Sequence, residues 1–470
     1  MTVNKIIRKF LSLDKSDFLL FSGVLIYSIV FSYIALLRHH AYQSLLLDLG
    51  YFDQSFWTTL HGAFFYTSSS ANFGMSQFGN HNSPILFIIL PFYALFPYPE
   101  TLLVVQSCVL ALAAIPLYYL SKEHLGRTGA LVICLAYFLY PPLHGVNLID
   151  FHEFAFVPLI LFTCFYYLFK KGIMGFLVSS CLALMIREDM ALIIMMIALY
   201  GLIKKNLYSH ERDRLILALI VLLSSFWLMM SLVVIIPAFN PAHIFSRFDL
   251  HYQGTGLTSL IFTHSDLKGI YLFELLCPLG FLSLLSPGIL LTAVPSLVEI
   301  LLSKYMYYSI NHFYQALLIP AIFVSCIFSM KKIITQSDSK IRWIHYKIYG
   351  FILIFTIVSF LIFTPSPLSP VSFFKQDYTI TQHQMVLDDV IMMIPPAASV
   401  STQSDIGAHL AQRFELYRDY RPGAEYILID RTTEWRWHNY HPQLLMFLDR
   451  YTLIYSNDGV ELYKLKQQII

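Results

Sequence analysis

The chain has 470 residues, of which 57% are hydrophobic and 13% are charged, whereas an ordinary soluble domain has about 45–50% apolar and about 25% charged residues. This composition excludes a single soluble domain, and a net charge of +2 gives no basic excess that would indicate a nucleic-acid partner. The apolar residues form long runs, which is typical of a polytopic membrane protein. All six cysteines lie inside these runs, so we expect neither a disulfide framework nor a thiolate metal site.

The first apolar run covers residues 18–37 and follows the basic residues Lys5, Arg8, Lys9 and Lys15. It is long enough to cross a bilayer and no small-residue cleavage site follows it, so we predict an uncleaved helix that starts in the cytoplasm. The later apolar runs cover residues 84–97, 101–120, 128–144, 154–169, 172–186, 190–203, 215–237, 269–285, 288–302, 313–330 and 345–364.

The run at 84–97 is too short to span a bilayer and is bounded by prolines. If it does not cross, eleven spans remain, with 16 basic residues in the short cytoplasmic loops and 5 in the opposite ones. If it crosses, most of those basic residues move outside, against the positive-inside tendency. We therefore predict a re-entrant or interfacial helix here.

Basic pairs flank residues 172–203 at both ends, so this segment should cross the membrane twice. Arg187, Glu188 and Asp189 then form the tip of an outward-facing hairpin with short arms. Polar groups at such a tip are expected to lie in protein or water rather than in lipid.

From residue 365 onward the chain becomes more polar, and eleven crossings place this part outside the cytoplasm. It begins with a proline-punctuated linker, then shows a helical pattern at 381–394 and strand-like runs at 399–401, 426–430, 453–456 and 460–464. The turn at 456–459 predicts a hairpin. The predicted fold is an α-helical polytopic membrane protein with a transmembrane domain at 1–364 and a small extracytoplasmic α/β domain at 365–470.

Acidic and histidine side chains gather in the predicted outer loops. Taken singly, a loop carboxylate is most often a helix cap or a solvated group, and this applies to Asp53. The group formed by Asp150, His152 and Glu153 is harder to explain in that way, because carboxylate and imidazole ligands also suit a divalent cation. Further candidates at the outer face, in chain order, are Asp48, Asp53, His81, Arg187, Glu188, Asp189 and His312.

A site at the outer interface suits a substrate whose reactive group lies at headgroup level, such as a lipid-linked phosphate. Its tail could lie between helices, and Asp48 could act as general base on an acceptor hydroxyl. The predicted phosphate contacts are the basic residues Arg187, Arg247, Lys268 and Lys304. The aromatic pair Trp435 and Trp437 could stack on sugar rings, although such pairs more often pack a domain core.

Several segments together resemble a family of predicted archaeal and bacterial membrane proteins of unassigned activity, which is similar in turn to the GT-C glycosyltransferases. The segments are Asp-Leu-Gly-Tyr-Phe-Asp-Gln at 48–54, His-Asn-Ser-Pro at 81–84, Asp-Phe-His-Glu at 150–153, Arg-Glu-Asp at 187–189, Asn-His-Phe-Tyr at 311–314 and Ala-His-Leu-Ala-Gln-Arg at 408–413. The resemblance runs along most of the chain.

The resemblance implies a GT-C-like fold and transfer of a sugar from a polyprenyl-phosphate carrier to a lipid, glycan or protein acceptor at the outer face of the plasma membrane. It implies that Asp48 is the base or orients the acceptor, and that Asp150, His152 and Glu153 form a second acidic cluster. We predict catalytic roles for Asp48, Asp53 and Asp150, with substrate contacts from His81, His152, Glu153, Arg187, Glu188, Asp189, Arg247 and His312. In metal-dependent members the second loop binds a divalent cation, so magnesium or manganese could be held by Asp48, Asp150, His152 and Glu153. Asp48 is followed by Leu49 where many members have a second acid, which leaves the metal open.

Two other functions stay open at this point. A transporter or flippase for a lipid-linked or small polar solute would also be a polytopic membrane protein, although no internal repeat and no midplane cluster of ionisable groups is visible in the sequence. A non-catalytic assembly protein that presents its outer domain to partners is the third.

Overall fold

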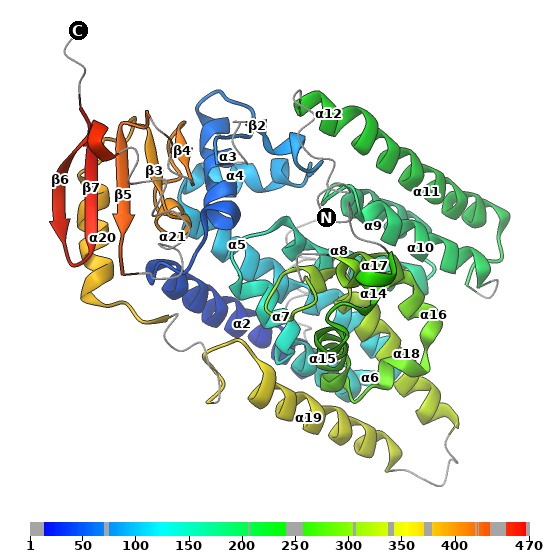
Figure 1. Ribbon diagram of the computed structural model, residues 1–470. Helices are drawn as coiled ribbons and strands as arrows, with labels where there is room; N and C mark the ends of the chain where they lie inside the picture. Colours follow the sequence, from blue (N-terminus) through cyan, green and yellow to red (C-terminus); the bar gives the residue numbers. More distant parts are fainter. Residues whose placement is uncertain are drawn as a thin grey trace, which may run out of the picture.

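The computed structural model describes residues 14–69, 75–204, 207–240, 257–303, 307–336, 343–370, 378–418, 421, 423–432 and 448–466. Helices fill most of the molecule, and a small sheet lies at one end (Figure 1). The predicted mostly helical architecture with a C-terminal α/β unit is confirmed in this coarse form.

Helix α2 (Lys15–His40) covers the first predicted span and packs against α5 (Pro99–Leu112) and α6 (Ala114–Phe138). Pro99 begins α5, where its missing N–H costs no intrahelical hydrogen bond. Inside α6, Gly126 has φ 74° and ψ −177°, which divides the helix at the predicted loop. The predicted helix at 128–144 ends earlier, at Phe138, and Pro141 begins a separate short helix, α7 (Pro141–Leu148).

Helix α4 (Leu86–Leu95) has 10 residues, which agrees with a segment too short to cross. Helices α8 (Phe156–Phe169), α9 (Ile173–Leu184) and α10 (Met190–Ile203) follow the predicted runs closely. Residues 185–189 join α9 to α10 as the predicted hairpin tip. Helix α11 (Glu211–Met230) packs along α10 and continues through a π-helical turn, Ser231–Ile235, into α12 (Ile236–Phe239).

The two runs predicted at 269–285 and 288–302 are not continuous helices. They form α15 (Ser265–Leu276), two 3-10 turns, α16 (Pro287–Leu290), a third 3-10 turn and α17 (Val294–Leu302). Pro278, Pro287 and Pro295 each remove a backbone donor, so the apolar run is divided at or near every proline. A short helix, α14 (Leu257–Phe262), precedes them.

Helices α18 (Ile319–Gln336) and α19 (Ile344–Phe363) match the last two predicted runs, except that 3-10 turn η8 (Tyr314–Leu317) delays the start of α18. Within the described ranges, five helical segments are long and apolar enough to cross a membrane: Lys15–His40, Pro99–Phe138, Glu211–Phe239, Ile319–Gln336 and Ile344–Phe363. The other apolar helices are shorter, so the count of eleven crossings stays a prediction.

The C-terminal sheet has the order β4-β3-β5-β7-β6 and is mixed. Strand β3 (Val400–Thr402) pairs in parallel with β4 (Leu416–Tyr417) and β5 (Tyr426–Asp430). Strands β6 (Tyr451–Asn457) and β7 (Val460–Leu465) form the predicted hairpin, and β7 runs antiparallel to β5. The sequence did not indicate the two-residue β4.

Helix α20 (Gln382–Met392) begins at a capping box made by Thr381 and Gln384, as the polar start of the predicted helix suggests. It packs beside the sheet, and the apolar core beneath it includes Tyr42 and Leu46 from the loop after α2. The backbone N–H of Leu46 also donates to Ser404 Oγ at 3.2 Å, on the short helix α21 (Ser404–Gly407). The C-terminal unit is therefore joined directly to the first loop.

Candidate functional site

The loop after α2 is attached to the second predicted loop by a buried ion pair. Arg38, in the last turn of α2, donates from Nη1 to Asp150 Oδ1 at 2.6 Å, and the backbone N–H of Leu45 donates to Asp150 Oδ2 at 2.8 Å. Asp150 has φ 111°, a conformation that L-residues rarely adopt and that often marks a functional site. Burial raises the pKa of Asp150 to about 6, opposed by the charge of Arg38, so the carboxyl is ionised at neutral pH.

Gln106 in α5 holds the loop that carries Asp150. Its Nε2 donates to the carbonyls of Asn147 and Asp150 at 3.0 and 2.7 Å, and its Oε1 accepts from the backbone N–H of His152 at 2.9 Å. Because Gln106 is fully buried, water cannot replace these bonds. One side chain therefore fixes the backbone on both sides of Phe151.

Asp48 lies on the π-helical turn η1 (Leu46–Gly50), and its Oδ1 is 3.2 Å from His152 Nε2. The His152 ring stacks on Phe313 at a centroid distance of 3.5 Å, which fixes its orientation. The Asp48 side chain is 25% exposed and that of His152 10%, so the carboxylate is the accessible member of the pair. His312 interacts electrostatically with both, and burial lowers its pKa.

Gly145 in α7 allows the His312 loop to approach. A Cβ at this position would lie 1.7 Å from the carbonyl oxygen of Ile310, so no larger residue fits without a backbone shift. This close contact brings His312 and Phe313 toward His152.

Arg187, at the tip between α9 and α10, is 4% exposed and its guanidinium lies 4.1 Å from the centroid of the Phe154 ring. Its Nε donates to Asp189 Oδ2 at 2.9 Å, and its Nη2 lies 3.8 Å from Glu299 Oε1. Glu153, 3% exposed, interacts electrostatically with Arg187 and His152. Glu153 Oε2 is buried without a hydrogen-bond partner among the described residues.

The same hairpin tip is tied to the first loop. Glu188 Oε1 accepts from His81 Nδ1 at 2.6 Å, and Glu188 Oε2 accepts from the backbone N–H of Asn82 at 2.9 Å. The Asn82 side chain donates in turn to Ser231 Oγ at 2.7 Å, in the π-helical turn after α11. Glu188 thus fixes the backbone that precedes α4.

These contacts and electrostatic interactions link nine of the predicted site residues into one network, which we call the polar cluster: Asp48, His81, Asp150, His152, Glu153, Arg187, Glu188, Asp189 and His312. Arg247, Lys304, Trp435 and Trp437 lie outside the described residues. Lys268 is elsewhere, with Nζ 5.2 Å from the Tyr308 ring centroid and 3.3 Å from the carbonyl oxygen of Ile261.

Asp53, which the sequence analysis predicts as catalytic, is not brought to the polar cluster. It lies on α3 (Tyr51–Leu60), where its Oδ1 accepts from the Tyr93 hydroxyl and from Gln412 Nε2, the latter at 3.4 Å. Burial raises the pKa of Asp53 to about 7. Asp53 therefore joins α3 to α4 and to the C-terminal unit, and we assign it no catalytic step.

The four residues predicted to hold a cation do not form a ligand set in this structure. Both carboxylate oxygens of Asp150 are engaged, by Arg38 and by the Leu45 amide. Within the described part of the chain, no three carboxylate, imidazole or thiol groups are placed to bind one metal ion. We therefore derive no step through a metal, and cation binding stays a prediction of the sequence.

The sequence alone did not indicate Arg38, Gln106 or Phe313 as parts of the site. In the sequence Arg38 is only a loop charge, and Phe313 is the start of a predicted span. Gln106 offered a signal, since it is an amide inside the apolar run 101–120. Buried polar groups of this kind usually have a defined partner.

The arrangement of helices with a small domain at one end is similar to that of a solved structure. The crystal structure of ArnT from Cupriavidus metallidurans bound to undecaprenyl phosphate aligns with a TM-score of 0.55 at 9% identity, covering 94% of this chain and 98% of that one. ArnT is a GT-C glycosyltransferase, so the fold of this chain is GT-C-like.

Residues 38–462 match the family model described as predicted membrane protein, DUF2079, and the chain belongs to that family. The predicted resemblance is confirmed. A search of curated proteins found no match.

Proposed function

We propose that the protein is a membrane glycosyltransferase that moves a sugar from a polyprenyl-phosphate-linked donor to a lipid, glycan or protein acceptor outside the cytoplasm. The observation that carries the proposal is the Asp48–His152 pair, 3.2 Å apart within a polar cluster, on a GT-C-like fold. The polyprenyl-phosphate class of donor is supported by the undecaprenyl phosphate bound to ArnT. On this proposal the polar cluster and the C-terminal unit lie on the extracytoplasmic side.

In the proposed reaction Asp48 acts as general base. Its carboxylate accepts the proton of the acceptor hydroxyl while that oxygen bonds to C1 of the sugar. The bond between C1 and the phosphate oxygen breaks, and the lipid phosphate leaves with the electron pair. The partly exposed Asp48 carboxylate can reach an acceptor, whereas Asp150 is enclosed by Arg38 and backbone.

The other members of the polar cluster support this chemistry through position and charge. His152, held by Phe313 and Gln106, places its Nε2 3.2 Å from the Asp48 carboxylate. Glu153 Oε2, which has no hydrogen-bond partner among the described residues, can accept from a sugar hydroxyl. Arg187 supplies a positive charge for the donor phosphate. To bind the phosphate, its guanidinium would give up the hydrogen bond that it donates to Asp189.

The test is an assay of the purified protein in liposomes with polyprenyl-phosphate sugars and a crude envelope extract as acceptor, reading release of polyprenyl phosphate. Asp48→Asn should lower the rate by about 10²- to 10⁴-fold, the usual contribution of a general base. The matched control is Asp389→Asn, an exposed carboxylate on α20. Equal rates for wild type and Asp48→Asn would remove Asp48 as the base.

The same liposomes distinguish sugar transfer from transport. Transfer predicts a new glycosidic bond in the acceptor fraction. Movement of an unaltered lipid-linked or small solute across the bilayer, with no new bond, would overturn the proposal in favour of a transporter or flippase.

A further inference from the structure

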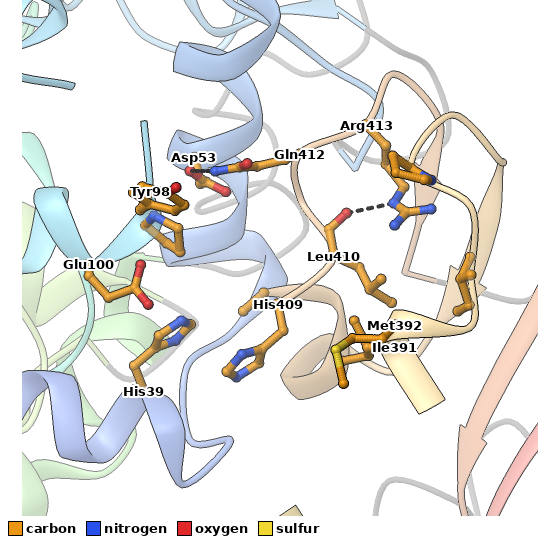
Figure 2. A pocket seen from close by; sticks show the side chains of 14 residues that line it. His39, Asp53, Tyr98, Glu100, Ile391, Met392, His409, Leu410, Gln412 and Arg413 are labelled. Carbon is orange, nitrogen blue, oxygen red and sulfur yellow. Dashed lines mark hydrogen bonds between the residues drawn. The ribbon is translucent and has the colours of Figure 1, made fainter. Parts of the chain in front are cut away.

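A cavity of about 460 Å³ lies between the C-terminal unit and the helices beside the first loop. Residues 408–410, 412 and 413 of the Ala-His-Leu-Ala-Gln-Arg segment line one side, and the end of α2 and the start of α5 line another. Figure 2 shows His39 and Glu100 on one side, His409 below, and the Asp53–Gln412 hydrogen bond above. The polar cluster described above does not contribute to this wall.

Three polar atoms of the lining residues lack a hydrogen-bond partner among the described residues. They are His39 Nδ1, His409 Nε2 and Glu100 Oε2, each buried. His39 is 1% exposed as a whole residue. Buried polar atoms are almost always bonded, and leaving one unpaired costs about 1–3 kcal/mol. Three such atoms from separate segments, around one cavity of ligand size, indicate a bound group that supplies the missing partners.

The two imidazoles are held in place for such a role. The His409 ring stacks on His39 at 4.1 Å and 5°, and on Tyr42 at 3.9 Å and 23°. Burial lowers the pKa of His409 to about 3, so its ring is neutral at physiological pH. A neutral ring can donate or accept a hydrogen bond without attracting an ion.

The charges around the cavity disfavour an anion. Glu100 and Asp53 supply carboxyl groups to the lining. Arg413 donates from Nε to the carbonyl of Leu410 and from Nη1 to the carbonyl of Ala398, both at 2.8 Å, so these two donors are already used. The described residues contain no group of three ligands suited to a metal ion. Met392 and Leu410 add apolar surface to the same lining. Mixed hydrogen-bonding atoms beside apolar side chains suit an uncharged ring with several hydroxyl groups.

We propose that this cavity binds an uncharged sugar ring, and that the ring belongs to the glycan of the acceptor. Only the second half rests on the proposed function, because sugar binding itself needs no transfer. The ring would bond His39, His409 and Glu100 through its hydroxyls and lay its C–H face on Met392 and Leu410. The volume, within the usual range of about 300–1,000 Å³, admits such a ring.

The test is saturation-transfer NMR of the full chain in lipid nanodiscs with methyl β-D-glucopyranoside and methyl β-D-galactopyranoside at millimolar concentration. His409→Phe keeps the stack with His39 and Tyr42 but removes the ring nitrogens, and should reduce the transferred signal at least fivefold. The control is His61→Phe, because His61 stacks on Trp57 at 4.0 Å and does not line the cavity. The control should keep the wild-type signal.

If the His409→Phe protein does not fold, Met392→Trp is the second test variant. Met392 is 75% exposed at the rim of the cavity, so a larger side chain there would fill the cavity. A transferred signal equal to that of wild type in the folded His409→Phe or Met392→Trp protein would overturn the inference. The absence of a signal from both glycosides with the wild-type protein would also overturn it. Binding of glucose 6-phosphate in preference to both glycosides would also overturn it. Because the readout is binding, glycoside signal in a protein that shows no transfer would overturn the proposed function alone.

Discussion

The carboxyl group of Asp53 offers a quantitative test of the interface between the helices and the C-terminal unit. An aspartate in an unfolded chain has a pKa of about 3.9, whereas burial raises the pKa of Asp53 to about 7. Between these values the folded state binds a proton that the unfolded state does not, so stability falls as the pH rises from about 4 to 7 and then stays level. Three pKa units correspond to about 4 kcal/mol.

Asp53→Asn should abolish this loss, because the amide oxygen can still accept from the Tyr93 hydroxyl and Gln412 Nε2 without carrying a charge. For a chain of this length about 4 kcal/mol corresponds to a rise of about 4–8 °C in the unfolding midpoint at pH 8. At pH 4 the two proteins should unfold at the same temperature.

The measurement is thermal unfolding in nanodiscs at both pH values, followed by tryptophan fluorescence, with Asp389→Asn as control. Asp389 is exposed, so its replacement should change neither midpoint. An Asp53→Asn protein whose unfolding midpoint at pH 8 is no higher than that of wild type would show that burial of the ionised Asp53 carboxyl carries no such cost.

Three further predictions concern the polar cluster. Gln106→Met removes the amide that holds the Asp150 loop. It should lower the initial rate of transfer at least tenfold while the fold stays intact, and an unchanged rate would refute the positioning role of Gln106. Arg38→Met leaves the Asp150 carboxylate buried without its positively charged partner, which should lower the unfolding free energy by about 3–5 kcal/mol. Adding Asp150→Asn should recover most of this loss, and equal unfolding midpoints for the single and double variants would contradict this prediction. Since both oxygens of Asp150 are engaged, chelation with EDTA should leave the transfer rate unchanged, and a loss that magnesium or manganese restores would show a cation site.

Parts of the fold could be predicted from the sequence because local patterns determine them. Helix α19 begins and ends within one residue of the predicted run at 345–364, since that run is uninterrupted. Strand β5 matches its prediction at 426–430, where the residues are buried throughout. The broken segment at 265–302 was not predicted, because apolar content gave two spans while Pro278 and Pro287 interrupt the helices.

For the candidate site, the sequence identified acids and histidines but not their partners. Asp48 and Asp53 are five residues apart, yet one faces His152 and the other faces Tyr93, because Asp48 lies in the π-helical turn η1 and Asp53 lies in helix α3, which follows it. The pairing of Arg38 with Asp150 joins residues 112 positions apart. No local pattern shows which loops meet, so only the structure places these contacts.

On the proposed function, the polar cluster holds the reacting end of a lipid-linked sugar. The most direct measurement is a cryo-electron microscopy structure of the Asp48→Asn protein in nanodiscs with a polyprenyl-phosphate sugar. We expect the lipid phosphate beside Arg187, with the sugar between the substituted side chain at position 48 and Glu153. A lipid bound with its phosphate away from the cluster, or no lipid density at saturating donor, would contradict it.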